Sequence, residues 1–341
     1  MNQERHGTGL TDIRVAFAGY GNVGRALHAL LDARHGELAR EYGMRVITTG
    51  VSSRRAGWTA NPDGLDPDAP LGMACVGVHA WLATSRADVV FEAIPLDALT
   101  GQPAIDYLRA ALEHGAHAIS ANKGPVVHGY RELARLADAR GRGYGFEASV
   151  MDGAPVFSLV RDCLPLAGLR AVRGVFTSTA TVIIEAVEEG LSIDDGIARA
   201  QQLGIAEADP SYDVDGWDSA VKLCAVANVL LDADLRPGDV VREGVRSISE
   251  QDIRDALADG RPYRLVGAIQ PDTTGVLRGS VRPERCDFGG PLGVVRGATL
   301  VMHYEADVFP GGLTVTSHDP NPTTTAYGML ADFVRLAGPT R

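Results

Sequence analysis

The chain has 341 residues and a net charge of −11, and its sequence pI is about 5.3. It contains no basic run. This charge pattern argues against nucleic acid and anionic membranes as partners. A hydrophobic fraction of 45% with 22% charged residues is typical of a globular protein with a sizeable core. Polar residues 1–12 predict a loose tail, not a signal peptide, and no apolar run is long enough to span a bilayer. Because the four cysteines are scattered without metal-type spacing, we expect a cytoplasmic protein with unpaired thiols.

A strand, a glycine turn and a helix follow the tail. The apolar run 13–18 predicts the strand and 23–34 the helix, with Gly19, Gly21 and Gly24 at their junction. In this context the GxGxxG pattern is typical of dinucleotide binding. The first glycine permits a tight turn, the second admits a pyrophosphate, and the third lets the helix pack closely on the strand. A glycine-rich turn without a ligand is the competing interpretation.

The second predicted strand, 44–51, ends in two serines followed by two arginines, of which Ser53, Arg54 and Arg55 concern the cofactor. An NAD site usually has an acidic residue here for the ribose hydroxyls, whereas hydroxyls and arginines suit a 2′-phosphate. We therefore expect NADP(H), with NAD(H) as the alternative. In the simpler interpretation the two arginines are merely exposed.

The α/β pattern continues after the second strand. Residues 56–82 predict a surface insertion with one short helix, and the continuous apolar run 87–95 is typical of a buried parallel strand. The next strand ends at Asn122 and Lys123, at the sheet edge that faces the ligand crevice in doubly wound folds. We therefore predict an α/β fold with a Rossmann-type doubly wound parallel sheet in residues 1–150. Further elements are predicted at 104–114, 130–140 and 144–148.

The pattern changes to an α+β type after Val150. Short alternating segments between 263 and 316, separated by Gly, Pro and Asp, predict an antiparallel sheet. Residues 151–317 are therefore predicted to form a second domain, and a C-terminal helix within 318–341 is predicted to return to the first. The remaining elements are expected as helices at 155–163, 182–189 and 191–204 and a strand at 169–176.

The stretch 207–222 concentrates five carboxylates around one lysine. Its helix begins near Trp217, so Asp218 and Lys222, four residues apart, lie on one helix face. The plainest interpretation is a solvated loop with a surface ion pair. A calcium loop is a weaker alternative, because the segment lacks the closing glutamate of an EF-hand.

The use of lysine is unusual in this chain. Of its 32 basic residues, only Lys123 and Lys222 are lysines, and all others are arginines. Arginine stays protonated, whereas burial and neighbouring charges can bring a lysine to exchange its proton. The two lysines therefore indicate two places where arginine would not serve, although chance retention is the competing explanation.

Five motifs now resemble one family in order and spacing over nearly the whole chain: GYGNVG, VFEAIP, SANKGPV, EADPSYDVDGWDSAVK and TAYGMLADFVRL. They resemble the homoserine dehydrogenases. The resemblance implies an NADP(H)-dependent oxidoreductase that interconverts L-aspartate 4-semialdehyde and L-homoserine in amino-acid biosynthesis, toward threonine and methionine. It also implies that the second domain is catalytic and forms a homodimer through its sheet.

The resemblance assigns roles residue by residue. Lys222 would give and take the proton at the substrate oxygen, and Asp218 would orient a substrate hydroxyl or water. Glu207 would bind the substrate amino group, and Lys123 would polarise the substrate at the nicotinamide edge. Further substrate contacts are implied for Asp213, Thr177 and Thr179. Cofactor contacts are implied for Gly19, Gly21, Asn22, Val23, Gly24, Ser53, Arg54, Arg55, Ala93, Asn122 and Lys123.

The family also binds a monovalent cation through backbone carbonyls, at positions that correspond to Glu147 and Val150 here. Three segments depart from its pattern: residues 177–181, where the family usually has Asn-Gly-Thr-Thr-Asn, Met151-Asp152-Gly153, where it usually has three glycines, and 318–322.

These departures leave a second hypothesis open, a dehydrogenase of the same fold acting on another small hydroxy or amino acid in specialised metabolism. A catalytically silent nucleotide sensor is a third hypothesis. The two lysines argue against a sensor, because a sensor would tolerate arginine.

Overall fold

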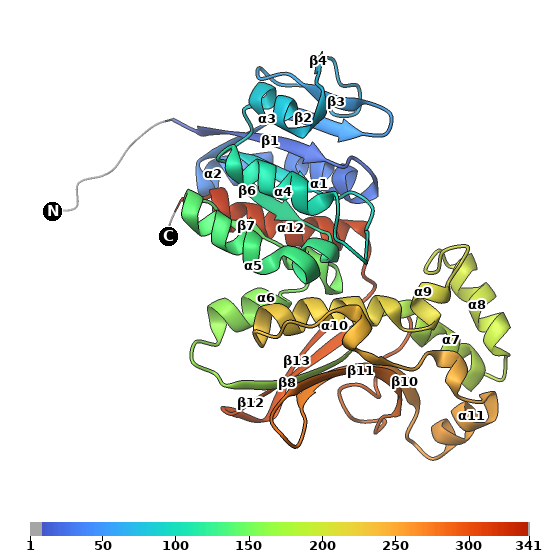
Figure 1. The fold of residues 1–341 in the computed structure, drawn as a ribbon. Coiled ribbons are helices and arrows are strands. Elements are labelled where there is room, and N and C mark those ends of the chain that lie inside the picture. Colours follow the sequence, from blue (N-terminus) through green and yellow to red (C-terminus); the bar gives the residue numbers. More distant parts are fainter. Residues whose placement is uncertain (1–8, 340–341) are drawn as a thin grey trace. The chain divides into compact units, whose positions relative to one another are not determined.

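The computed structural model describes residues 9–339, which form two compact units (Figure 1). The first unit contains the chain up to Pro125, Arg131–Ala148 and the chain from Pro322 onward, and the second contains Val126–Tyr130 and Ser149–Asn321. Most of the expected tail, 1–12, lies outside the described residues, and Thr11 already opens the first strand.

The first unit is built on a seven-stranded sheet in the order β4-β3-β2-β1-β5-β6-β7. β1 pairs in parallel with β2 and β5, and β6 and β7 extend the sheet in the same direction. Reversal of the strand order at β1, with helices in the crossovers, is the topology of a doubly wound sheet, which confirms the predicted fold class. The strands are β1 (Thr11–Ala18), β2 (Met44–Ser53), β3 (Gly57–Ala60), β4 (Met73–Ala74), β5 (Val89–Glu92), β6 (His117–Ser120) and β7 (Tyr144–Gly145).

The insertion 56–82 is more ordered than predicted. It holds β3 and β4, which extend the sheet from β2 as antiparallel strands, and the start of α3 (Gly77–Ser85). Strands of four and two residues are too short to show an alternating pattern, so the sequence carried no signal for them. Trp81 of α3 is fully buried, and its indole N–H donates a hydrogen bond to the Thr59 carbonyl at 3.0 Å.

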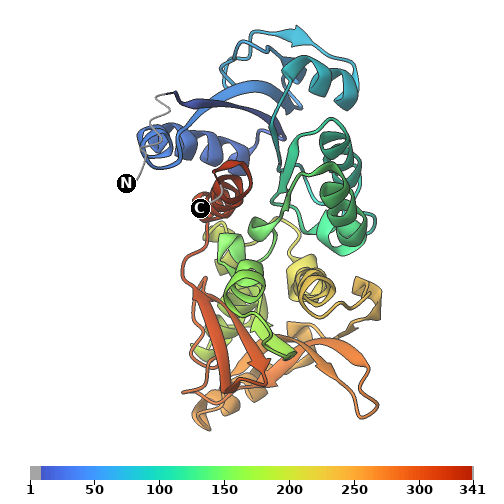
Figure 2. The same ribbon diagram turned by 90° about the vertical axis from the view of Figure 1, so that its left-hand side faces the viewer.

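The C-terminal helix α12 (Pro322–Ala337) belongs to the first unit, as predicted, and packs along α1, where Figure 2 shows it in red beside the dark blue helix. The ring of Phe333 lies 5.7 Å from that of Phe91, which lies 5.4 Å from the ring of Phe17 on β1. The last helix therefore completes the core formed by the first strand. The other helices of this unit are α1 (Asn22–Ala33), α2 (His35–Tyr42), α4 (Ala104–Glu113) and α5 (Lys123–Arg140), whose residues 126–130 lie in the second unit.

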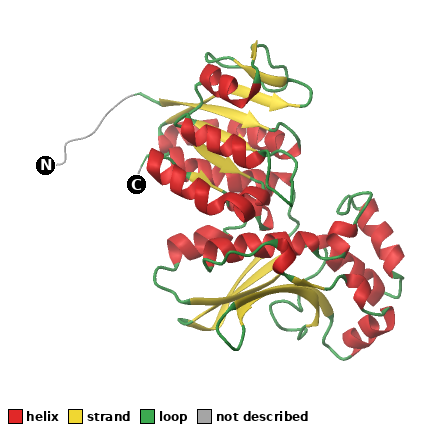
Figure 3. Cartoon of the chain, viewed as in Figure 1, coloured by secondary structure: helices red, strands yellow, loops and turns green. Residues whose placement is uncertain are grey.

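The second unit contains a six-stranded sheet in the order β13-β12-β8-β10-β11-β9, with helices packed against it (Figure 3). All pairs are antiparallel except the short β9–β11 pair. The antiparallel sheet predicted between 263 and 316 is thus present, with β8 inserted at its centre. The strands are β8 (Leu169–Val175), β9 (Val241–Arg242), β10 (Tyr263–Pro271), β11 (Leu277–Arg285), β12 (Leu300–Ala306) and β13 (Phe309–Ser317).

Helix α7 (Ser178–Glu188) begins four residues before the predicted start at Val182. Its first turn lies in the Thr-rich segment 177–181, which the sequence placed before the predicted helix. Threonine has low helix propensity, but Thr179 and Thr181 are buried, and this packing overrides the propensity. The other helices are α6 (Val156–Ser158), α8 (Ile193–Gln202), α9 (Ser211–Val214), α10 (Trp217–Leu230) and α11 (Glu250–Ala258), with a π-helical turn at Leu159–Cys163 and 3₁₀ turns at Glu147–Ser149, Met151–Gly153, Pro237–Asp239 and Val245–Ser247.

Within residues 9–339, no helix combines the length and apolar character needed to cross a membrane. The four cysteines are unpaired, as expected.

Candidate active site

The glycine turn between β1 and α1 has the shape that a dinucleotide phosphate requires. Gly19 has a φ of 99°, and a Cβ there would lie 2.6 Å from the Ala93 carbonyl oxygen, so only glycine fits. A Cβ on Gly24 would lie 2.6 Å from the carbonyl oxygen of Gly19, whereas a Cβ on Gly21 would meet no atom within 4 Å. The turn is therefore tight at its ends and open in the middle. Helix α1 starts at Asn22 without a side-chain cap, which leaves its first N–H groups for a phosphate.

The other predicted cofactor residues lie at the carboxyl ends of strands or at helix starts in the same unit. Ser53 ends β2, and Arg54 and Arg55 follow it as exposed residues. Ala93 follows β5 directly. Asn122 caps α5 by accepting a hydrogen bond from the Gly124 backbone N–H at 3.0 Å, and Lys123 is the first residue of that helix.

A buried carboxyl group at the end of β5 was not predicted as a site residue. Glu92 has no exposed surface, and it accepts hydrogen bonds from the Ile94 backbone N–H at 2.9 Å and from the Ser120 hydroxyl. Burial raises the pKa of Glu92 from 4.5 to about 7, although these hydrogen bonds act in the opposite direction. A charged residue inside the apolar run VFEAIP was the sequence signal that could have revealed it.

We expect Glu92 to make stability depend on pH. Between pH 4.5 and about 7 the folded protein binds the extra proton, so its free energy of unfolding falls as the pH rises through this window. A pKa rise of this size lowers the free energy of unfolding by about 3 kcal/mol across the window. Urea unfolding of the wild type and Glu92→Gln at pH 5 and pH 8 measures it, because the variant cannot ionise. Parallel pH dependence in both proteins would contradict the expectation.

The second unit places Lys222 at the centre of a polar cluster. Its ammonium donates to a carboxylate oxygen of Asp218 at 2.9 Å, one turn earlier on α10, and to the Phe176 carbonyl oxygen at 2.7 Å. Only 14% of the lysine side chain is exposed. A lysine ammonium has three donors, and since these are its two acceptors among residues 9–339, the third donor can serve a ligand oxygen. The contact to Phe176 had no sequence signal, because its acceptor is a backbone group.

Several carboxylates keep Lys222 charged. Burial alone lowers the pKa of Lys222, but Asp218, Asp152 and Asp213 together outweigh burial, and the pKa is raised. Asp152 was not among the predicted residues, although the departure from three glycines in its segment was a signal. Met151 and Asp152 have φ values of 55° and 50°, in the left-handed region that costs a residue with a Cβ about 1–2 kcal/mol.

The predicted substrate residues divide into two groups. The Thr179 hydroxyl on α7 donates to Asp213 at 2.7 Å, and Thr177 is the buried residue before that helix. Thr179 therefore joins the cluster around Lys222 through Asp213, and Thr177 follows Phe176, whose carbonyl accepts from Lys222. Glu207 does not join this cluster: it lies exposed in the loop before α9. The residues predicted for a cation are buried, with Glu147 in the first unit and Val150 in the second. Among the described residues, no cluster of His, Cys, Asp or Glu side chains could hold a metal ion.

A doubly wound sheet with a glycine turn of this shape is typical of dinucleotide-binding proteins, and comparison with known proteins places the chain in the class of NAD(P)-dependent oxidoreductases that act on a CH–OH group. The particular family follows from comparison with known proteins. Residues 155–334 match the family model described as homoserine dehydrogenase, and the chain belongs to this family.

Relatives of similar length support the same assignment. The chain is 31% identical to an NAD(+)-dependent homoserine dehydrogenase of Pseudomonas canavaninivorans, over 96% of this chain and 97% of the relative. It is 28% identical to a homoserine dehydrogenase of Methanocaldococcus jannaschii, over 96% and 99%. Among solved structures, a homoserine dehydrogenase from Thiobacillus denitrificans superimposes with a TM-score of 0.81 at 26% identity, covering 96% of this chain and 73% of that one. A hyperthermophilic archaeal homoserine dehydrogenase mutant in complex with NADPH shares the fold, with a TM-score of 0.79 at 22% identity over 96% of this chain and 98% of that one.

Proposed function

We propose that this protein interconverts L-aspartate 4-semialdehyde and L-homoserine with Lys222 as the acid and base. The observation that carries the proposal is the Lys222 ammonium, buried between Asp218 and the Phe176 carbonyl with one donor left. Family membership supports the substrate, because the relatives are named homoserine dehydrogenases.

In the reducing direction, the third N–H of Lys222 binds the carbonyl oxygen of the semialdehyde and supplies its proton as negative charge develops there. General acid catalysis of this kind contributes roughly 10²–10⁴-fold. Asp218 holds the ammonium in place, and the raised pKa of Lys222 keeps it protonated near neutral pH, so the proton to be donated is present when the substrate binds. In the oxidising direction, the ammonium first releases its proton to solvent water, and the neutral amine then takes the proton of the substrate hydroxyl as the hydride leaves.

A bound nicotinamide cofactor supplies or accepts the hydride in this reaction. The glycine turn and the start of α1 would hold its pyrophosphate. Exposed Arg54 and Arg55 at the end of β2 suit a 2′-phosphate and support NADP(H), with Asn122 and Lys123 as further contacts. The NAD(+)-dependent relative makes NAD(H) the alternative.

The test is homoserine oxidation by the purified protein with NADP⁺ and with NAD⁺, followed at 340 nm. We expect turnover with homoserine and a higher kcat/KM with NADP⁺. Arg54→Ala/Arg55→Ala should lose the preference for NADP⁺ without losing turnover with NAD⁺. No turnover with either nucleotide in either direction would refute the substrate, and equal kcat/KM values would refute only the cofactor preference.

A second candidate is a related dehydrogenase acting on another small hydroxy or amino acid. The left-handed Met151–Asp152 turn favours this second candidate, because Asp152 adds a carboxylate near Lys222 where the family usually has glycine. A panel of hydroxy and amino acids decides between the candidates, and a clear preference for homoserine over every analogue removes this one.

The remaining parts of the proposal rest on the family resemblance. It supports a homodimer formed through the six-stranded sheet, a place in threonine and methionine biosynthesis, and a monovalent cation held by backbone carbonyls near Glu147 and Val150. A cytoplasmic location is supported instead by the scattered cysteines and the polar N-terminal sequence.

A further inference from the structure

Helix α7 carries the Lys222 site at its first turn. The Phe176 carbonyl, which accepts from Lys222, lies two residues before the helix. Thr179, in its first turn, donates to Asp213. A change in the position of α7 would therefore move the acceptor of the lysine and the partner of Asp213 together.

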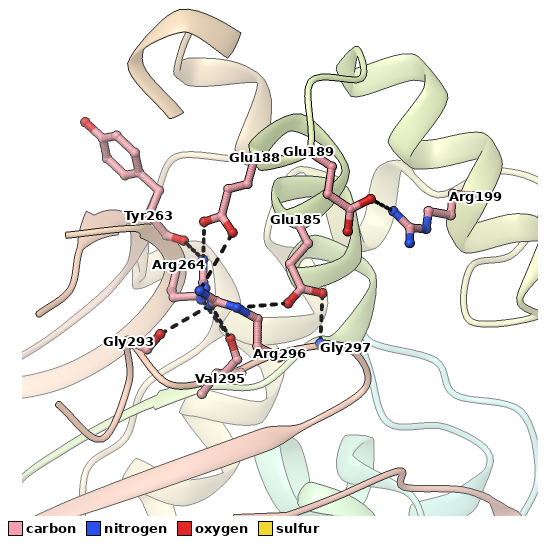
Figure 4. Close-up of polar contacts among 10 residues, drawn as sticks. All are labelled: Glu185, Glu188, Glu189, Arg199, Tyr263, Arg264, Gly293, Val295, Arg296 and Gly297. Atoms are coloured by element: carbon pink, nitrogen blue, oxygen red, sulfur yellow. Dashed lines mark hydrogen bonds and ion pairs between the residues drawn. The ribbon is translucent and has the colours of Figure 1, made fainter. Parts of the chain in front are cut away.

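The other end of α7 is held by four charged side chains, called here the ion cluster: Glu185, Glu188, Arg264 and Arg296 (Figure 4). Arg264 on β10 has no exposed surface. Its Nη1 donates to Glu188 at 2.8 Å, and its Nε donates to the Val295 carbonyl at 3.0 Å. Burial raises the pKa of Glu188 to about 7, and the charge of Arg296 acts against that rise.

Arg296, in a loop, shares the Val295 carbonyl with Arg264 and also reaches Glu185. Its Nη1 donates to the Val295 carbonyl at 2.9 Å, and its Nε lies 3.4 Å from Glu185. The Gly297 backbone N–H also donates to Glu185, at 2.9 Å. Two guanidinium groups thus share one carbonyl, which requires the two carboxylates to offset their like charges. The Val295 side chain is buried in the core with Val175 and Val266, and this packing holds the Val295 carbonyl in place.

The loop also reaches the start of the helix. The Ser178 hydroxyl, in the first turn of α7, donates to the Ala298 carbonyl at 3.0 Å. Residues 295–298 therefore contact α7 at both ends: through the ion cluster at the C-terminal end, and through Ser178 beside the Lys222 site.

We propose that Arg296 is a positioning residue for the Lys222 site, because it fixes the loop 295–298 that holds α7 at both ends. The proposal rests on the proposed function of Lys222. In the enzyme, Arg296 sets where the Phe176 carbonyl and Thr179 stand and touches neither substrate nor cofactor. Arginine suits this place because its planar group binds carboxylate and carbonyl oxygens at once, which a lysine ammonium does with less geometric definition.

The test compares Arg296→Met with Arg199→Met in the full-length protein. Arg199 pairs with Glu189 at the same end of α7, at 2.5 Å (Figure 4), but on the surface and without contact to the loop. The site is read directly by NMR of protein labelled at lysine Cε, because the chain has two lysines and therefore two signals. Lys123→Arg assigns the signal of Lys222.

We expect Arg296→Met to shift the Lys222 signal and to lower kcat/KM for homoserine roughly ten- to a hundredfold, as small misplacements of reacting groups do. Arg199→Met should change neither, and Arg296→Lys should restore part of the loss. If the Lys222 signal does not move in Arg296→Met, the proposal is overturned. This holds when the variant keeps its activity, and also when it loses activity because the fold has become less stable. If the wild type proves inactive on homoserine, the proposed function fails, and the NMR comparison still decides the role of Arg296. If Arg296→Met does not fold, Glu185→Gln replaces it, with the same expected shift.

Discussion

Lys222→Arg is expected to lower kcat for homoserine oxidation by roughly 10²–10⁴-fold, the usual contribution of general acid–base catalysis. Arginine keeps the positive charge and can keep the pair with Asp218, which now measures 2.9 Å. It cannot give up a proton near neutral pH. The loss therefore isolates proton transfer from charge, and steady-state kinetics across pH 6–10 measures it.

The matched variant is Lys123→Arg. The family resemblance implies that Lys123 polarises the substrate, a role that needs a cation but no proton exchange, so the kcat of Lys123→Arg should fall by a smaller factor. Thermal unfolding of both variants, followed by circular dichroism, checks that each is folded. Normal turnover by Lys222→Arg would contradict the proposed role of Lys222 in proton transfer. It would indicate that the residue acts only through its positive charge.

The largest effect on stability is expected from Arg264→Met. The variant removes the guanidinium nearest to Glu188, at 2.8 Å, and leaves this carboxylate, whose side chain is 6% exposed, with Arg296 at 3.9 Å. Breaking a buried ion pair from one side typically lowers the free energy of unfolding by about 3–5 kcal/mol. Urea denaturation at pH 8 measures the change, because Glu188 is then ionised in the wild type.

Two comparisons show whether pairing is the cause. Arg264→Met/Glu188→Leu should recover much of the loss, since an apolar pair replaces the ions without leaving a charge unpaired. Arg199→Met, which breaks the exposed pair with Glu189, should cost less than about 1 kcal/mol. If Arg264→Met costs no more than Arg199→Met, the ion cluster does not stabilise the second unit.

Sequence patterns were sufficient to predict local structure where the geometry depends on the residue type or spacing itself. The glycines at 19, 21 and 24 predicted a turn whose shape the structure shows. The spacing of Asp218 and Lys222 predicted their side-by-side arrangement on α10. The scarcity of lysine drew attention to Lys222 before any geometry was known.

The sequence was insufficient where packing or the backbone decides. The first turn of α7 is helical against the propensity of its threonines, because those side chains are buried. The Phe176 carbonyl has no residue-type signal, since every residue carries one. Asp152 and Glu207 show the same limit for carboxylates, because the position of an acid in the sequence does not reveal whether it lies near the lysine in the fold. The charge of Asp152 acts on Lys222, whereas Glu207 is exposed.

The position of α12 affects the order in which the protein can fold during synthesis. The core of the first unit includes Phe17 from the first strand and Phe333 from the last helix, so the nascent chain cannot complete it until residues 322–337 have been made. The second unit draws nearly all its residues from the continuous segment Ser149–Asn321 and contains no residue of α12, so it can fold as soon as that segment has been made. We therefore expect the second unit to reach its native state before the first, while the N-terminal strands wait as a partly assembled sheet, the form most exposed to aggregation and to chaperones.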